Sequence, residues 1–491
     1  GERSETRDSC AVTECARETG MSCRVSRGPA HNQTRHHIYR PSVRSWHSVA
    51  EGGSKVKVLE RQIAQIRQGG RTVLFRKLRQ LLCLPHKLLL CILAVPVVVV
   101  IRLIRPWLLV RWGSLISERI GHFAANIELY LCERDVGINV PKQRHVDIFF
   151  MGGPICNRQL AKMWKRVLRV WPAWILSPIS RVNGLIPGGA IHEVGNNTQH
   201  DRDVHNLLDR FPPHLKFTSE EETRGEAGLR VMGIPTGTPF VCLIVRDSAY
   251  LDAHQTKDWS YHNYRDCNIQ NFVLAAEELA DRGCFVLRMG VKAHDAIKSD
   301  HPRVIDYATN GMRSDFMDVY LGAKCAFCIS TGTGFDAVPL IFRRPIVCVN
   351  DVPLGYLRTF SAQFINITRN HFVAQKDREL TLREIFTHGV GFCLHTSDYE
   401  SKGIRLIENT PQEIRDVVIE MIERLNGTWQ TYEEDEALQR RFWEIFPTDA
   451  VDPRRGRPLH GEIRARFGTV FLRNNRRWLE RVNCSVLSKA R

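Results

Sequence analysis

The 491-residue sequence lacks the patterns that mark several large classes of protein. It has no Gly-X-Y or heptad repeat, which excludes collagen-like and long coiled-coil structures. Its 15 cysteines form no regularly spaced framework, which excludes a small disulfide-stapled module. Hydrophobic residues make up 43% of the chain, so it is not an intrinsically disordered protein. The length suggests two or three domains of about 150 residues each.

The cysteines favour a reducing compartment and no bound metal. Most lie in apolar runs, as Cys242 and Cys348 do, where a free thiol behaves as a small buried hydrophobe. The pair Cys325 and Cys328 has the CxxC spacing, but no second pair follows it. We therefore expect reduced thiols in a cytosolic protein, without a metal site or a cofactor.

The net charge of +16 is concentrated at the two ends of the chain. Residues 1–111 contain 20 Lys and Arg against 7 Asp and Glu, and residues 452–491 contain 11 against 3. The residues between them contain 38 against 43 and are mildly acidic. The sequence also shows no helix-turn-helix, RNP or zinc-finger signature, so we expect no nucleic-acid partner.

The first basic region surrounds an apolar run. Residues 1–55 are polar and non-periodic, and we expect them to be disordered or extraneous. Residues 56–84 have the spacing of a basic amphipathic helix, and residues 88–101 contain no charge. Because basic residues flank both ends of this run, whereas a single span is expected to have them mainly on one side, we favour a re-entrant or monotopic anchor over 56–116 on an anionic membrane surface. A single span and a buried hairpin remain alternatives.

Strands and helices alternate in the rest of the chain, which predicts an α/β fold with parallel, doubly wound sheets. We predict strands over residues 146–151, 240–245, 285–289, 304–306, 326–329 and 346–349. We predict helices over residues 157–170, 200–211, 268–282, 314–323, 335–342 and 460–482.

Polar residues follow four of these strands, where parallel sheets bind their ligands. They are Arg246 and Asp247, Arg288 and Gly290, Asp306, and the run Ser330, Thr331, Gly332, Thr333 and Gly334. The run combines small residues with a following helix, which suits a diphosphate, and the arginines can bind phosphate oxygens. It is neither a Walker A loop nor a dinucleotide fingerprint.

Several motifs together resemble an uncharacterised family of bacterial proteins identified as glycosyltransferases. They lie at residues 117–123, 156–160, 245–250, 287–290, 305–308 and 313–318. The resemblance extends from about residue 56 to the C-terminus. It implies a GT-B-like arrangement of two Rossmann-like domains facing across a cleft, an acceptor-side domain over 117–235 and a nucleotide-sugar-binding domain over 236–450. It also implies that residues 451–491 return to the first domain and that no metal is needed.

A transferase of this kind needs a base for the acceptor hydroxyl. His192, Asp201, His262 and Asp266 are the candidates in polar loops. Asp201 also begins a DxD motif, but no apolar strand precedes it, so we interpret it as a helix start rather than a metal site.

The sequence thus favours a glycosyltransferase that moves a sugar from a nucleotide-diphospho-sugar to a lipid-linked or cell-envelope glycan acceptor. We expect it at the cytoplasmic face of the inner membrane. A sugar-nucleotide epimerase or phosphotransferase of similar fold is the alternative, followed by a non-catalytic membrane scaffold or a nucleic-acid-binding protein. The sequence does not indicate an oligomeric state.

Overall fold

The computed structural model describes residues 84–194, 202–247 and 260–480. All of them belong to one compact unit, Leu81–Arg491. The predictions for residues 1–55 and for the amphipathic stretch before residue 84 lie outside this part of the chain. We refer to residues 84–194 as the N-terminal half and to the described residues 202–480 as the C-terminal half.

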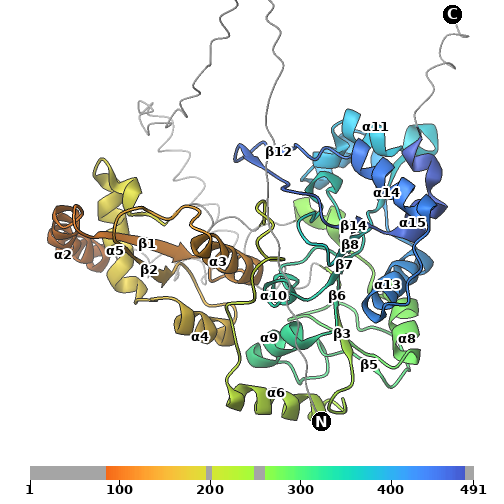
Figure 1. Cartoon of the computed structure of the whole chain (residues 1–491), viewed down its shortest axis with the longest axis horizontal. Helices are drawn as coiled ribbons and strands as arrows, with labels where there is room; N and C mark the ends of the chain where they lie inside the picture. Colours follow the sequence, from red (N-terminus) through yellow and green to blue (C-terminus); the bar gives the residue numbers. More distant parts are fainter. Residues whose placement is uncertain (1–83, 195–201, 248–259, 481–491) are drawn as a thin grey trace, which may run out of the picture. The chain divides into compact units, whose positions relative to one another are not determined.

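The N-terminal half is built around two long parallel strands (Figure 1). β1 (Leu109–Leu115) and β2 (His145–Met151) pair along their whole length, and single bridges at Glu193 and Val170 extend this sheet on either side. The helices are α2 (Leu84–Leu103), α3 (Ile120–Asp135), α4 (Arg158–Val167) and α5 (Ala173–Leu185), followed by the 3-10 helix η1 (Gly189–His192). With two named strands among the described residues, this half is smaller than the complete Rossmann-like domain that the sequence predicts.

The C-terminal half holds a seven-stranded sheet in the order β14-β8-β7-β6-β3-β4-β5, and every pair in it is parallel. Its strands are β3 (Phe240–Ile244), β4 (Phe285–Arg288), β5 (Val304–Ile305), β6 (Cys328–Ser330), β7 (Ile346–Cys348), β8 (Phe364–Asn366) and β14 (Arg466–Phe467). The predicted α/β class and the parallel sheet are confirmed.

Helices cover both faces of this sheet. They are α6 (Ser219–Val231), α8 (Val273–Asp281), α9 (Asp315–Lys324), α10 (Ala337–Ile341), α11 (Leu382–Thr387), α12 (Thr396–Ser401), α13 (Pro411–Asn426), α14 (Glu433–Ile445) and α15 (Thr469–Asn474). The 3-10 helices η3 (Ser260–Arg265) and η4 (Ile269–Phe272) precede α8. An antiparallel sheet, β9 (Asn370–Val373) between β10 (Arg378–Glu379) and β11 (Ile404–Ile407), and a hairpin of β12 (Val451–Asp452) and β13 (Arg457–Pro458) complete the half.

Alternate residues of β3 point into two different hydrophobic cores. Cys242 and Ile244 join a core that includes residues of α9 and α10, whereas Val241 and Leu243 join a core that includes residues of α8 and α13. The first of these cores also contains residues of α3, among them Phe123. The two halves therefore share one continuous hydrophobic core.

Two predicted helices are wrong. Over residues 202–211 the chain forms turns, because the buried Asp203 accepts hydrogen bonds from the amides of Leu207 and Leu208 at 2.9 and 2.7 Å. Over 460–480 the chain adds the edge strand β14 and only then the short helix α15. Here Gln439 of α14 bonds the backbone of Phe467, which holds the chain extended.

Candidate functional site

The carboxyl ends of four neighbouring strands, β6, β3, β4 and β5, bring together the polar residues singled out in the sequence. Arg288 ends β4 and is only 2% exposed. Its Nη1 lies 3.4 Å from Asp306 Oδ1, and its Nη2 lies 3.7 Å from Asp247 Oδ2. If Gly290 carried a Cβ atom, that atom would lie 3.3 Å from the Cβ atom of Ala308. We call these strand ends, with Arg246 and residues 330–334, the strand-end site.

The loop of residues 330–334 is held in place from within the fold. The fully buried Ser330 hydroxyl donates to Asp336 Oδ2 at 2.7 Å and accepts from the Gly332 amide at 3.1 Å. Asp336 also forms an ion pair with Arg358 at 2.8 Å. Ser330 therefore shapes the loop from below, a role different from the direct anion contact that the sequence suggests.

Two arginines lie beside this loop. The amide of Arg246 donates to Thr331 Oγ1 at 2.8 Å, and its guanidinium lies 3.2 Å from Asp266 Oδ1. The guanidinium of Arg265 donates to the carbonyl oxygen of Gly332. The sequence predicts Arg246 as a ligand-binding residue but not Arg265, which lies in η3, away from any strand end. Two guanidinium groups beside a strand-to-helix loop suit a diphosphate.

Glycines allow the loop to make a close contact with the N-terminal half. Gly332 has a φ of +73°, which a side chain would disfavour. Gly334 touches the first turn of α3, because a Cβ on Gly121 would lie only 3.1 Å from Gly334 Cα. The amino end of α3, a 16-residue helix with positive potential at that end, therefore meets the strand-end site.

Two predicted base candidates lie near the arginines of the site. His262 belongs to η3, and its pKa is lowered to about 4 by burial and by the positive charges of Arg265 and Arg246. The imidazole is therefore neutral at pH 7. Burial raises the pKa of Asp266, and the neighbouring Arg246 opposes this rise.

Glu118 and His122 also flank this contact, and neither is among the candidates predicted from the sequence. Glu118 is exposed between β1 and α3, and its Oε2 would lie 2.8 Å from a Cβ on Gly153 in the loop after β2. His122 lies in the first turn of α3, next to Gly121. β1 falls inside the membrane segment that the sequence predicts over residues 56–116. The sequence therefore does not show that Glu118 follows a strand. The signal available is the motif over residues 117–123.

The other two base candidates do not join the site. His192 is 1% exposed, its Nδ1 lies 2.7 Å from the carbonyl oxygen of Val110, and its ring stacks on Trp112. It packs η1 against β1, and burial lowers its pKa. Asp201 lies outside the described residues.

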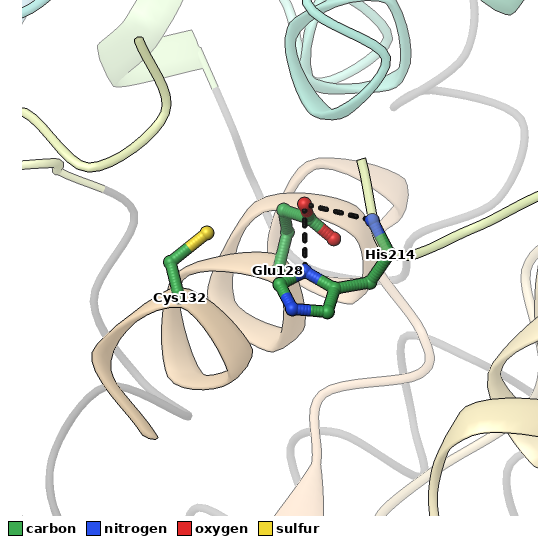
Figure 2. A group of neighbouring side chains, drawn as sticks. All are labelled: Glu128, Cys132 and His214. Carbon is green, nitrogen blue, oxygen red and sulfur yellow. Dashed lines mark hydrogen bonds and ion pairs between the residues drawn. The ribbon is translucent and has the colours of Figure 1, made fainter. Parts of the chain in front are cut away.

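A carboxylate, a thiol and an imidazole gather away from this site, in Glu128, Cys132 and His214 (Figure 2). His214 contacts Glu128 at 3.1 Å and Asp135 at 2.8 Å, and Arg343 contacts Glu128 at 2.6 Å. Burial by itself lowers the pKa of His214, but hydrogen bonds to Cys132 and Glu128 outweigh it and raise the pKa to about 10. Since two cations face two carboxylates, we interpret this group as an ion network that joins the halves, and we call it the α3 ion network.

No protein-family model matches this sequence, and no curated protein matches it. Solved glycosyltransferases are similar to it at low identity. The E. coli ADP-heptose LPS heptosyltransferase II is 14% identical, over 64% of this chain and 98% of that chain, with a TM-score of 0.38. A family 9 glycosyl transferase from Veillonella parvula is 9% identical, over 48% and 79%, with a TM-score of 0.31. The E. coli heptosyltransferase WaaC, solved with ADP-2-deoxy-2-fluoro heptose, is 12% identical, over 49% and 88%, with a TM-score of 0.25.

Proposed function

We propose that the chain is a glycosyltransferase that moves a sugar from a nucleotide-diphospho-sugar to an acceptor hydroxyl without a metal ion. The observation that carries the proposal is the contact between the loop at residues 330–334, its flanking Arg246 and Arg265, and the amino end of α3. Fixed N–H donors and guanidinium groups stabilise the negative charge that develops on a leaving diphosphate. The family resemblance of the sequence supports the same reaction.

The arginines of the strand-end site have two roles. Arg246 and Arg265 bind the diphosphate. Arg288 is a positioning residue, because it is buried between Asp247 and Asp306. These carboxylates in turn accept from backbone amides of the loop after β4.

Glu118 is the acceptor-side base in this proposal. It is an exposed carboxylate two residues before the start of α3, which puts it close in sequence to the contact with Gly334. A carboxylate can accept the proton of the acceptor hydroxyl directly, as that oxygen forms the new glycosidic bond, without a second residue to activate it. His262 and Asp266 lie beside the arginines and are the second choice.

The acceptor that we propose is a lipid-linked or cell-envelope glycan, and the place is the cytoplasmic face of the inner membrane. The support is α2, which has the length and hydropathy of a membrane helix, with only 11% of its most apolar window buried. An enzyme held at the bilayer surface meets a lipid-linked acceptor by diffusion in two dimensions.

The test is to incubate the full chain with a lipid-linked or cell-envelope glycan acceptor and a panel of nucleotide-diphospho-sugars, including ADP-linked, UDP-linked and GDP-linked sugars, and to measure the nucleoside diphosphate released. The variant Glu118→Gln should lower the rate at least about 100-fold, the usual contribution of a general base. Glu226→Gln, at an exposed carboxylate on α6, is the matched control and should leave the rate unchanged. An epimerised nucleotide-sugar or a sugar phosphate as the product would favour the alternative enzymes and contradict the transferase.

A further inference from the structure

Helices α2 and α5 together present a large apolar surface. α2 exposes Leu88, Ile92 and Leu103, and beyond its end Trp107 is 74% exposed. From α5, Trp174 and Leu185 are 65% and 84% exposed. A concentration of exposed apolar side chains such as this one marks a surface that a partner or a membrane covers. We call this surface the α2–α5 face (Figure 1).

α2 is attached to α5 along one stripe. Ala94 and Val98 are 5% and 0% exposed and belong to a small core with residues of α5. One turn further along the same stripe, the Arg102 guanidinium donates to Asn183 and to the carbonyl oxygens of Ile186 and Pro187, at the carboxyl end of α5. These bonds satisfy its charge within the protein, where the helix dipole favours a cation. Arg102 therefore does not interrupt the exposed side of α2.

α5 is in turn fixed to the small sheet at both of its ends. The bridge between Phe149 and Val170 precedes it, and the bridge between Trp112 and Glu193 follows it. A helix that crossed the bilayer in the position of α2 would carry α5 and these sheet connections into the hydrocarbon, where their polar backbone groups have no water. The geometry therefore favours a helix that lies in the plane of the membrane surface.

The charges around the face have one sign. Residues 84–117 and residues 154–192, far apart in the sequence, contain no Asp or Glu. Within these segments Lys87, Arg105 and Arg181 are exposed on or directly beside α2 and α5, whereas Arg102 and Arg111 are bound inside the protein. Trp107, Trp171 and Trp174 add exposed indole rings, which prefer the boundary between lipid headgroups and acyl chains.

We infer that the α2–α5 face is a monotopic docking surface for an anionic lipid bilayer, in which both helices lie within the headgroup boundary. This deepens the proposed membrane association, because it adds α5, which the sequence did not indicate, and assigns α2 an in-plane position. It does not depend on the transfer reaction. Apolar side chains insert into the boundary region, and the surrounding basic residues hold the anionic headgroups.

The test is flotation of the full chain with phosphatidylcholine vesicles, with and without phosphatidylglycerol. The triple variant Trp171→Ser, Trp174→Ser and Leu185→Ser changes exposed positions in and beside α5 only, and should lower the floated fraction at least about tenfold. Val231→Ser, at a 74% exposed apolar position on α6, is the matched control and should float like the unchanged chain. Phosphatidylglycerol should increase flotation, and high salt should reduce this gain.

Three results would overturn the inference. Unchanged flotation of the triple variant, with resistance to alkaline extraction, would show that α2 spans the bilayer without α5. Absence of flotation for the unchanged chain, together with a dimer that the triple variant dissociates, would show that a second copy covers the face. Absence of flotation for a monomer would show that another segment of the chain covers it. Normal folding of the triple variant is checked by its melting temperature.

Discussion

The two parallel sheets of this protein serve different purposes. The N-terminal half has two seven-residue strands, and most of its exposed large apolar side chains lie along α2 and α5. The parallel sheet of the C-terminal half has seven strands, of five residues or fewer, and their residues are almost all buried. Four of these strands end in the polar residues of the strand-end site. In the function that we propose, the C-terminal half provides the donor site, and the N-terminal half provides one side of it and the surface that we infer binds the membrane.

The two halves are nevertheless joined, and changes at the joint test whether the halves act independently. The α3 ion network and the Gly121–Gly334 contact both lie between them, and a hydrophobic core runs through both. If the N-terminal half were an independent lobe, changes at the joint would have little effect on stability or ligand binding.

The largest effect is expected for Arg343→Ala. The change leaves the fully buried Glu128 carboxylate without its guanidinium partner and also removes hydrogen bonds to backbone carbonyl groups. It should lower the free energy of unfolding by about 3–5 kcal/mol, the usual cost of breaking a buried ion pair from one side. Urea unfolding measures it. Arg282→Ala, which breaks partly exposed pairs, should cost about 0–1 kcal/mol. Equal losses for the two variants would show that the network does not hold the halves together.

A smaller effect is expected for Gly121→Ala, because the added methyl group would lie 3.1 Å from Gly334 Cα. Overpacking of this kind costs about 1–3 kcal/mol, and here it should also weaken nucleotide-sugar binding. Gly184→Ala has open space around the new methyl group and should be neutral or stabilising by up to about 1 kcal/mol. Thermal unfolding of both variants, with and without a nucleotide-sugar, measures their stability and their ligand binding. An unchanged ligand affinity in Gly121→Ala would show that the contact with α3 does not contribute to ligand binding at the strand-end site.

A third effect, recognised by its pH dependence, is expected from His214. Its pKa is raised to about 10 in the folded chain, against about 6.5 when unfolded. The imidazolium therefore contributes stability that is complete below about pH 6.5 and is lost as the pH rises through about 10. The difference in melting temperature between the unchanged chain and His214→Gln should shrink over this interval. His388→Gln, at an exposed histidine, should show no such trend. A difference that stays constant with pH would contradict a charged His214.

Most of the C-terminal sheet could be predicted from the sequence, because its strands are short apolar runs bounded by turns. The strands at Phe240–Ile244 and Ile346–Cys348 are examples. β1 could not be separated from the apolar helix that precedes it, because it lies inside the membrane segment predicted over residues 56–116. α5 was missed because it contains Pro178 and Gly184, which ordinarily argue against a helix interior.

Within the site, chain order predicted the strand ends but not the hydrogen bonds between them. Ser330 and Arg288 carry polar groups at the right edge of the sheet, yet both are buried and bind neighbouring side chains. Arg265 lies in a segment without strand character, and its tertiary contact with Gly332 brings it to the site. Glu118 follows β1, which the sequence does not separate from the predicted membrane segment.

The most direct test of the central claim is the melting temperature of the full chain with each nucleotide-diphospho-sugar of the panel. At least one of them should raise the melting temperature of the unchanged chain and of Arg282→Ala, and the rise should disappear in Arg265→Ala, because this change removes the guanidinium beside Gly332. No rise with any nucleotide-sugar, or an undiminished rise in Arg265→Ala, would contradict the assignment of the strand-end site as the donor site.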